Sequence, residues 1–66
     1  MRVRYDQTTD AVSFHLDDSL IVESEEVQPG IIIDFNHDNQ VGGIEILGVK
    51  TRVPEADPTQ VQFEIR

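Results

Sequence analysis

Cysteine is absent from this chain of 66 residues, and basic residues are scarce. Without cysteine, disulfide bonds, iron–sulfur clusters and thiolate zinc sites are excluded, and His15 and His37 are the only nitrogen ligands left for a metal. Five basic residues stand against thirteen acidic ones, which gives a net charge of −8. This balance opposes binding to phosphate backbones and to anionic membranes. We therefore expect no nucleic-acid or membrane partner, whereas a basic protein partner is compatible.

Long hydrophobic runs are also missing. The opening residues MRVRYDQ contain no apolar core of a signal peptide. No stretch approaches the roughly 18 apolar residues of a membrane span, so the sequence predicts a cytoplasmic protein. A chain this short forms a single domain, residues 1–66, and buries only a modest share of its surface. Self-association into a homo-oligomer is a reasonable expectation, because natural chains of this size often need added stabilisation.

Apolar residues mostly follow the two-residue period of strands. Pro29-Gly30 suits the centre of a type II turn, and Pro54 to Pro58 allows at most one short helical turn, near residues 54–58. The pattern predicts a mainly β fold (α+β at most), a small antiparallel meander of five or six strands. The expected strands lie around Val3 and Tyr5, at Val12 to Leu16, Leu20 to Gln28, Ile31 to Phe35, Val41 to Leu47 and Gln60 to Ile65.

Residues 34–45, DFNHDNQVGGIE, match the ligand spacing of an EF-hand calcium loop. Oxygen-bearing side chains occupy the first, third, fifth and twelfth positions of the loop: Asp34, Asn36, Asp38 and Glu45. The match departs at the sixth position, where the sharp bend favours glycine and this chain has Asn39. The flanks fit less well, because three isoleucines precede the loop and Gly48 follows it closely, and neither side favours a helix.

The same stretch also reads as a β-hairpin with a two-residue turn at Asp38–Asn39. This turn places His37 opposite Gln40, Phe35 opposite Gly42, Ile33 opposite Ile44 and Ile31 opposite Ile46. A slip of one residue would break these apolar pairs, so the apolar pattern predicts this pairing register.

In that register, Asp34 and Glu45 form a diagonal pair about 7–8 Å apart, which is too far for one ion to bind both without rearrangement. The hairpin is therefore the preferred interpretation of the stretch, and the calcium site is the alternative. Three apolar residues, Ile32, Val41 and Leu47, fall on the opposite face of the hairpin. The terminal strand, a short helix or a second subunit could cover them.

Other chemistry-bearing residues do not assemble into a recognisable site. Glu23, Glu25 and Glu26 lie in a poorly patterned extended segment that fits an edge strand, and they are the candidate contacts for a basic partner. His15 and His37 fit surface positions, and no serine lies in a nucleophile motif. No nucleophile, base and orienting group can be combined. We therefore predict no catalytic residues, no cofactor and no enzymatic activity.

Three stretches carry a family resemblance: VRYDQTTDAVSFHL, VESEEVQPGIIIDFN and DNQVGGIEIL. In order and spacing, the chain resembles DUF2283, a family of very small bacterial proteins of unknown function, over roughly residues 1–50. It departs from the family at Asn39, where glycine is usual, at Gly42, where an apolar residue is common, and after Leu47. The resemblance implies a compact β-rich fold in a bacterial cytoplasm and assigns no catalytic or binding residue.

The sequence thus predicts an uncharacterised small domain that acts as a non-enzymatic protein-interaction or self-associating module. The resemblance adds an alternative, because such small genes sometimes lie beside toxin-like partners. In that case the chain would be an antitoxin-like accessory protein that binds a basic partner through its acidic surface. Calcium or ligand binding at the loop of residues 34–45 is the remaining alternative.

Overall fold

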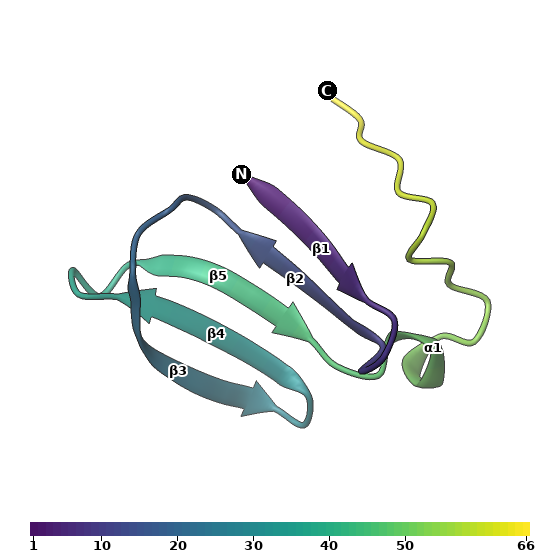
Figure 1. Ribbon diagram of the computed structural model, residues 1–66, viewed down its shortest axis with the longest axis horizontal. Coiled ribbons are helices and arrows are strands. Elements are labelled where there is room, and N and C mark those ends of the chain that lie inside the picture. Colours follow the sequence, from purple (N-terminus) through teal and green to yellow (C-terminus); the bar gives the residue numbers. More distant parts are fainter.

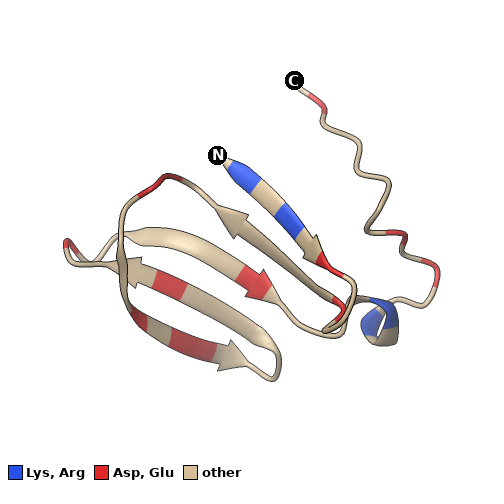
Figure 2. Ribbon diagram, in the orientation of Figure 1, with Lys and Arg blue, Asp and Glu red and all other residues tan.

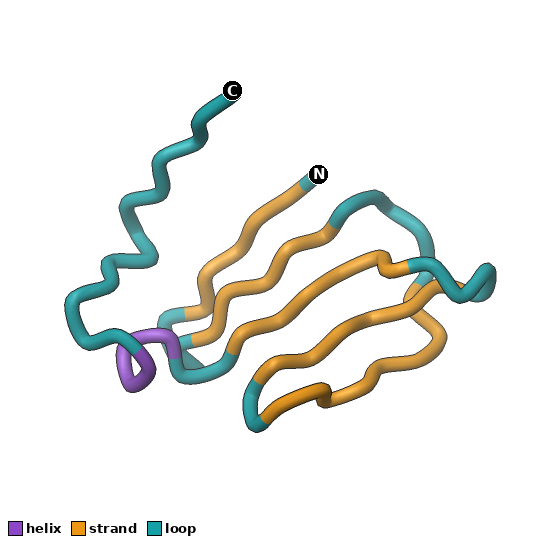
Figure 3. The backbone as a smooth tube through the Cα atoms, turned by 180° about the vertical axis from the view of Figure 1, so that it is seen from behind, coloured by secondary structure: helices purple, strands orange, loops and turns teal.

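The computed structural model describes residues 1–66 and shows one open β-sheet with a short helical turn (Figure 1). The elements are β1 Arg2–Asp6, β2 Ala11–His15, β3 Ile21–Gln28, β4 Ile31–Asn36, β5 Val41–Ile46 and α1 Val49–Arg52. The predicted mainly β fold is confirmed, with five antiparallel strands. Seen from behind, the strands form a single layer with no second sheet against it (Figure 3). No helix in the chain is both long enough and apolar enough to span a membrane.

The strand order is β1-β2-β5-β4-β3, and every neighbouring pair is antiparallel. This order differs from that of a simple meander, because the chain passes from β2 to the far edge at β3 and returns through β4 to β5. The last strand is therefore the central one. Gly42 and Gly43 of β5 are buried there between the neighbouring strands. The two free edges are β1 and β3, so the prediction of an edge strand at residues 20–28 is confirmed.

The hairpin of β4 and β5 has the predicted register over most of its length. Ile31 faces Ile46, and Ile33 faces Ile44. Phe35 instead faces Val41, because a β-bulge at Gly42 inserts one extra residue into β5.

The turn of this hairpin also differs from the two-residue prediction. The amide of Asn36 donates to the carbonyl of Gln40 at 3.0 Å, and three residues, His37 to Asn39, lie between them. The amide of Asn39 donates to the carbonyl of Asn36, also at 3.0 Å. Asn39 itself has a φ of 60°, which is the left-handed conformation that this type of three-residue loop requires. The prediction of a hairpin is thus confirmed and that of its turn length is wrong.

The chain after β5 differs more from the sequence prediction. The single helical turn is α1, a few residues before the predicted position at 54–58, where the backbone forms only a turn. Arg52 fixes α1 to the end of the sheet by donating hydrogen bonds to the carbonyls of Leu47 (2.8 Å) and Pro29. The expected strand from Gln60 to Ile65 is not formed, because the segment runs beside the sheet without pairing with it. An alternating pattern produces a strand only where a partner supplies the ladder hydrogen bonds.

The strand register sorts the sheet into two faces. On the apolar face, one row crosses all five strands as Val3, Phe14, Ile44, Ile33 and Glu25. A second row runs Tyr5, Val12, Ile46, Ile31 and Gln28. None of the hydrophobic residues of the chain is fully buried. The sheet therefore has an apolar face without the second layer that normally covers one.

The opposite face is mainly polar, and Ile32 and Leu47 lie there as expected. The prediction for Val41 is wrong, because the bulge at Gly42 pairs Val41 with Phe35 and so places it on the apolar face. Val41 and Leu47 are exposed, and Ile32 is half-buried. Charged residues are distributed unevenly over the sheet: basic residues occur only on β1, which ends at Asp6, and the other acidic residues of the strands lie on β3, β4 and β5 (Figure 2). The polar face therefore changes from basic at one edge to acidic across its middle.

Candidate functional site

Two carboxyl groups meet near the centre of the polar face. Asp34 lies on β4 opposite Gly43, and Glu45 lies on β5 opposite Ile32 and Ser13. In the register this is a diagonal arrangement, as predicted. The two carboxyl groups lie close enough for Asp34 to raise the pKa of Glu45. We refer to Asp34, Glu45 and the neighbouring Ser24 as the carboxyl cluster.

Gly43 explains how the side chains close the diagonal gap. A Cβ atom on Gly43 would lie 3.2 Å from Oδ2 of Asp34 and 3.0 Å from the carbonyl oxygen of Phe14. Because glycine lacks that atom, the carboxyl group of Asp34 lies in the space that a side chain would occupy. The sequence contained a signal for this approach of the two carboxyl groups. The spacing of Asp34 and Gly43 in the predicted hairpin places them opposite each other.

Burial and hydrogen bonding define the electrostatics of the cluster. Asp34 is 5% exposed, which is unusual for a carboxylate unless its oxygens are hydrogen-bonded. Its Oδ1 accepts a hydrogen bond from Oγ of Ser24 at 2.6 Å. The hydrogen bond with Asp34, together with partial burial and the nearby negative charge, raises the pKa of Glu45. A proton shared between two carboxyl groups is the usual result of such proximity.

The other residues of the predicted calcium site serve the turn instead. Oδ1 of Asn36 accepts hydrogen bonds from the backbone amides of Asp38 and Gln40, each at 3.0 Å. Asp38 is exposed, and its Oδ1 lies 3.4 Å from Nε2 of His37. Strands flank residues 34–45 on both sides, where an EF-hand would have helices. The structure thus brings together Asp34 and Glu45 of the four candidates, and it places Asn36 and Asp38 in the hairpin turn.

The remaining candidates are dispersed. Glu23, Glu25 and Glu26 are exposed along the free edge of β3. His15 lies on β2 beside Gly43, on the polar face, and His37 lies in the exposed hairpin turn. The carboxyl cluster can hold or release a proton, and its exposed side can attract a cation. No group of three or more histidine or acidic side chains is arranged to hold a metal ion.

The architecture defines a class: a small antiparallel β domain of one open sheet, apolar on one face and polar on the other. Within that class, the chain belongs to the DUF2283 family of proteins of unknown function, whose model matches residues 2–50. The match covers all five strands and ends within α1. No curated protein and no solved structure matches the chain significantly.

Proposed function

We propose that this chain is a non-enzymatic interaction domain that self-associates through the apolar face of its sheet. One observation carries the proposal: no hydrophobic residue is fully buried in the folded chain. Phe14, Ile33 and Ile44 lie side by side across three strands of the apolar face and are only half-buried. A sheet face of this kind is stable when another layer covers it.

The accessible surface has the size that this proposal requires. A compact monomer of 7.5 kDa exposes about 4,200 Å². This chain exposes 5353 Å², an excess of roughly 1,100 Å² carried by the open sheet and the extended C-terminal segment. A standard protein interface buries about 800 Å² on each partner. The excess is therefore comparable to what one subunit contributes to a stable dimer.

The chain itself covers only one end of the apolar face. Val49, Val53 and Pro58, in and after α1, form one wall of a groove of about 430 Å³. The opposite wall comes from the sheet and includes Phe14 and Ile31. The groove is lined mostly by apolar side chains. An apolar partner surface would fill it.

A second copy of the chain suits this face better than a charged partner does. The two rows of the apolar face carry a single charged residue, Glu25, and it lies at the edge. The carboxyl cluster lies on the opposite face, so a face-to-face dimer keeps most of the net charge in solvent. A two-fold dimer uses the same patch on both subunits, and an uncharged apolar patch is compatible with itself.

Light scattering over a range of concentrations tests the proposal. We expect a mass of twice 7.5 kDa for the native chain. Ile33→Thr, on the apolar face, should weaken the dimer about tenfold or more, because it removes apolar contact area from both subunits. Ile32→Thr is the matched control, since the adjacent residue of β4 points to the polar face. A mass of one chain at high concentration, with circular dichroism showing intact strands, would overturn the proposal.

A second candidate is an accessory role toward a basic protein, as for an antitoxin. Its support is the free edge of β3, where Glu23, Glu25 and Glu26 are exposed on a chain of net charge −8. Titration with a lysine-rich peptide at low salt, followed by amide NMR shifts, separates the two candidates. Shifts confined to β3 and abolished by salt favour this role, and unchanged shifts argue against it.

A further inference from the structure

The outer edge of β1 is unpaired although an extended segment of the same chain lies nearby. β1 pairs only with β2, so every second residue along it has a free backbone N–H and C=O. The segment from Gln60 to Arg66 runs beside β1 in the opposite direction, and both chain ends lie at the same end of the sheet (Figure 1). We call residues 60–66 the C-terminal strap.

The strap has the pattern of a strand with one apolar face. Val61, Phe63 and Ile65 alternate with polar residues, and they are 68%, 78% and 87% exposed. Three large apolar side chains at a period of two residues are unfavourable in water unless they join an apolar surface. The apolar face of the sheet ends at β1, with Val3 and Tyr5.

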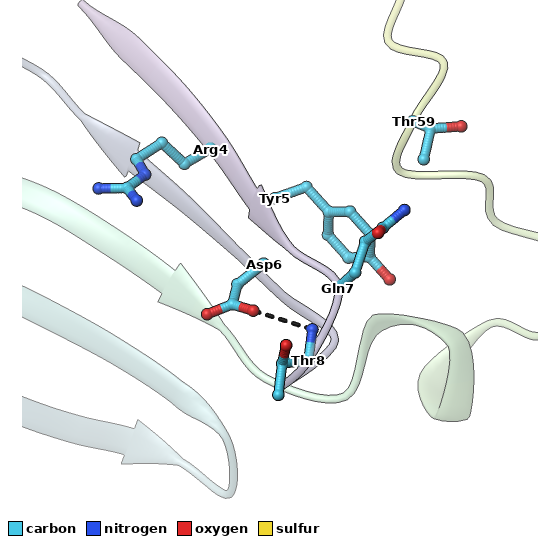
Figure 4. A pocket seen from close by; sticks show the side chains of 6 residues that line it. All are labelled: Arg4, Tyr5, Asp6, Gln7, Thr8 and Thr59. Atoms are coloured by element: carbon cyan, nitrogen blue, oxygen red, sulfur yellow. Dashed lines mark hydrogen bonds between the residues drawn. The ribbon is translucent and has the colours of Figure 1, made fainter.

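A short turn positions the start of the strap next to this edge. The backbone amide and Oγ1 of Thr59 both donate to Oδ1 of Asp57, at 3.0 and 2.5 Å, and the amide of Gln60 donates to the carbonyl of Asp57 at 3.0 Å. Thr59 and residues 4–8 line a common cleft of about 610 Å³ (Figure 4). In that view Thr59 lies on one side of the cleft, and Tyr5 and Gln7 lie on the other.

The cleft and the side-chain pattern restrict the pairing register. If the apolar residues of the strap are to lie on the apolar face, Thr59 must pair with an odd-numbered residue of the cleft, which leaves Tyr5 or Gln7. Pairing with Gln7 gives the longer ladder and places Glu64 opposite Arg2. Pairing with Tyr5 leaves Glu64 beyond the end of the strand.

We propose that the free edge of β1 is a strand-docking site and that its occupant is the C-terminal strap of the same chain. The structure holds the open state, in which the strap is unpaired. In the docked state the strap lies antiparallel to β1, with Thr59 beside Gln7, Val61 beside Tyr5 and Phe63 beside Val3. Its backbone completes the ladder of β1, and its apolar side chains extend the apolar face by one strand. This inference goes beyond the proposed function, because it assigns an interface to an edge of the sheet rather than to its face.

Docking of the strap changes which surfaces are open to other molecules. An unpaired edge accepts extended segments of other chains. With the strap docked, β3 is the only remaining free edge, and its glutamates discourage pairing with a foreign strand. With the strap released, the β1 edge is available to an extended segment with alternating apolar residues. The strap therefore competes with any such partner for the same edge.

A spin label on the full chain tests the docking. Because the chain has no native cysteine, Gln62→Cys provides a unique attachment site for a nitroxide. We expect the label to broaden the amide signals of β1 within the same molecule. Adding Glu64→Arg places like charges opposite each other at Arg2 and should reduce the docked-to-open ratio at least about twofold, the size of a cross-strand charge effect. Adding Arg2→Glu as well should restore it.

Two controls make each outcome decisive. Arg66→Glu inverts a charge beyond the paired region and should leave the broadening unchanged. A mixture of isotope-labelled chain and spin-labelled unenriched chain reports only contacts between molecules. Absence of β1 broadening, broadening that Glu64→Arg does not alter, or broadening found equally in the mixture overturns the proposal. The dimer mass is measured separately on unlabelled chain, so failure here is distinguishable from failure of the self-association proposal.

Discussion

At the residue scale, Asp10 connects the first hairpin to the only helical turn. Its φ is 52°, a left-handed conformation that aspartate adopts more readily than most residues. Its carbonyl accepts from the amide of Val49 at 3.0 Å, and its Oδ2 accepts from the amide of Lys50 at 2.8 Å. Its Oδ1 accepts from the hydroxyl of Tyr5 at 2.7 Å. A single helical turn is unstable alone, so α1 depends on these hydrogen bonds.

The first prediction is the titration of Tyr5, the only tyrosine of the chain. The hydrogen bond to Asp10, the largest cause, raises the pKa of Tyr5 to about 12. Absorbance of the phenolate should therefore show a midpoint near that value. Asp10→Asn should return the midpoint toward the ordinary value of about 10. A wild-type midpoint near 10 would contradict the assigned contact.

The raised pKa of Tyr5 also determines how the stability of the chain depends on pH. A raised folded-state pKa means that the hydrogen bond stabilises the chain fully below the unfolded-state pKa of about 10. This contribution is lost as the pH rises from there to about 12. Asp6→Asn is the control, because Asp6 contributes least to the raised pKa of Tyr5 and should move the midpoint little.

At the element scale, the central hairpin shows what the sequence could and could not specify. The apolar pairs Ile31–Ile46 and Ile33–Ile44 were predictable, because a slip of register would expose them. The turn was not, because its length depends on the side chain of Asn36, which accepts from two backbone amides in the turn. The bulge at Gly42 follows from that longer turn. Local hydrogen bonds therefore determined the length of the turn, which the apolar pattern did not specify.

The C-terminal region and the carboxyl cluster were predicted less well for a different reason. The alternation from Val61 to Ile65 is present, but a strand needs a partner edge that the sequence pattern does not name. Asp34 and Glu45 were correctly placed on one face, yet their contact depends on the space above Gly43. In both cases the outcome depends on residues of a neighbouring strand. The pattern within a single segment does not contain that information.

The second prediction concerns the interaction between the carboxyl groups of Asp34 on β4 and Glu45 on β5. The pKa of Glu45 is raised, so ionising it in the folded chain costs free energy. This cost is absent below the unfolded-state pKa, develops as the pH rises through that value, and is complete above the folded-state pKa. Glu45→Gln keeps a hydrogen-bond donor for Asp34 and removes the charge. We expect it to stabilise the chain at pH 7 by about 1 kcal/mol, the net worth of one such bond.

Urea unfolding at several pH values measures this effect. The difference in unfolding free energy between Glu45→Gln and the native chain should be small near pH 4 and should grow toward pH 7. Glu55→Gln is the matched control, because Glu55 is exposed and lies outside the sheet. A constant difference across this range would mean that Asp34 and Glu45 do not share a proton.

At the scale of the whole molecule, the chain forms its backbone ladder without enclosing an apolar interior. The chain makes 31 backbone hydrogen bonds, 22 of them within its strands and helical turn, yet only four residues are buried, and none is hydrophobic. Hydrophobic burial is the main favourable term in folding, so a lone chain should be only marginally stable. If copies associate through the apolar face, folding and association become one process.

The third prediction therefore links thermal stability to concentration. For a chain that folds as a dimer, each tenfold increase in concentration contributes about 0.7 kcal/mol per chain, which should raise the Tm by roughly 3–6 °C in a domain of this size. Thermal unfolding followed by circular dichroism over a hundredfold range of concentration measures this slope. Ile33→Thr should lower the Tm at every concentration more than Ile32→Thr does, because only Ile33 lies on the proposed interface. A cooperative transition at the same temperature throughout the range would show that the single open sheet is stable by itself, and the apolar face would then need no second copy.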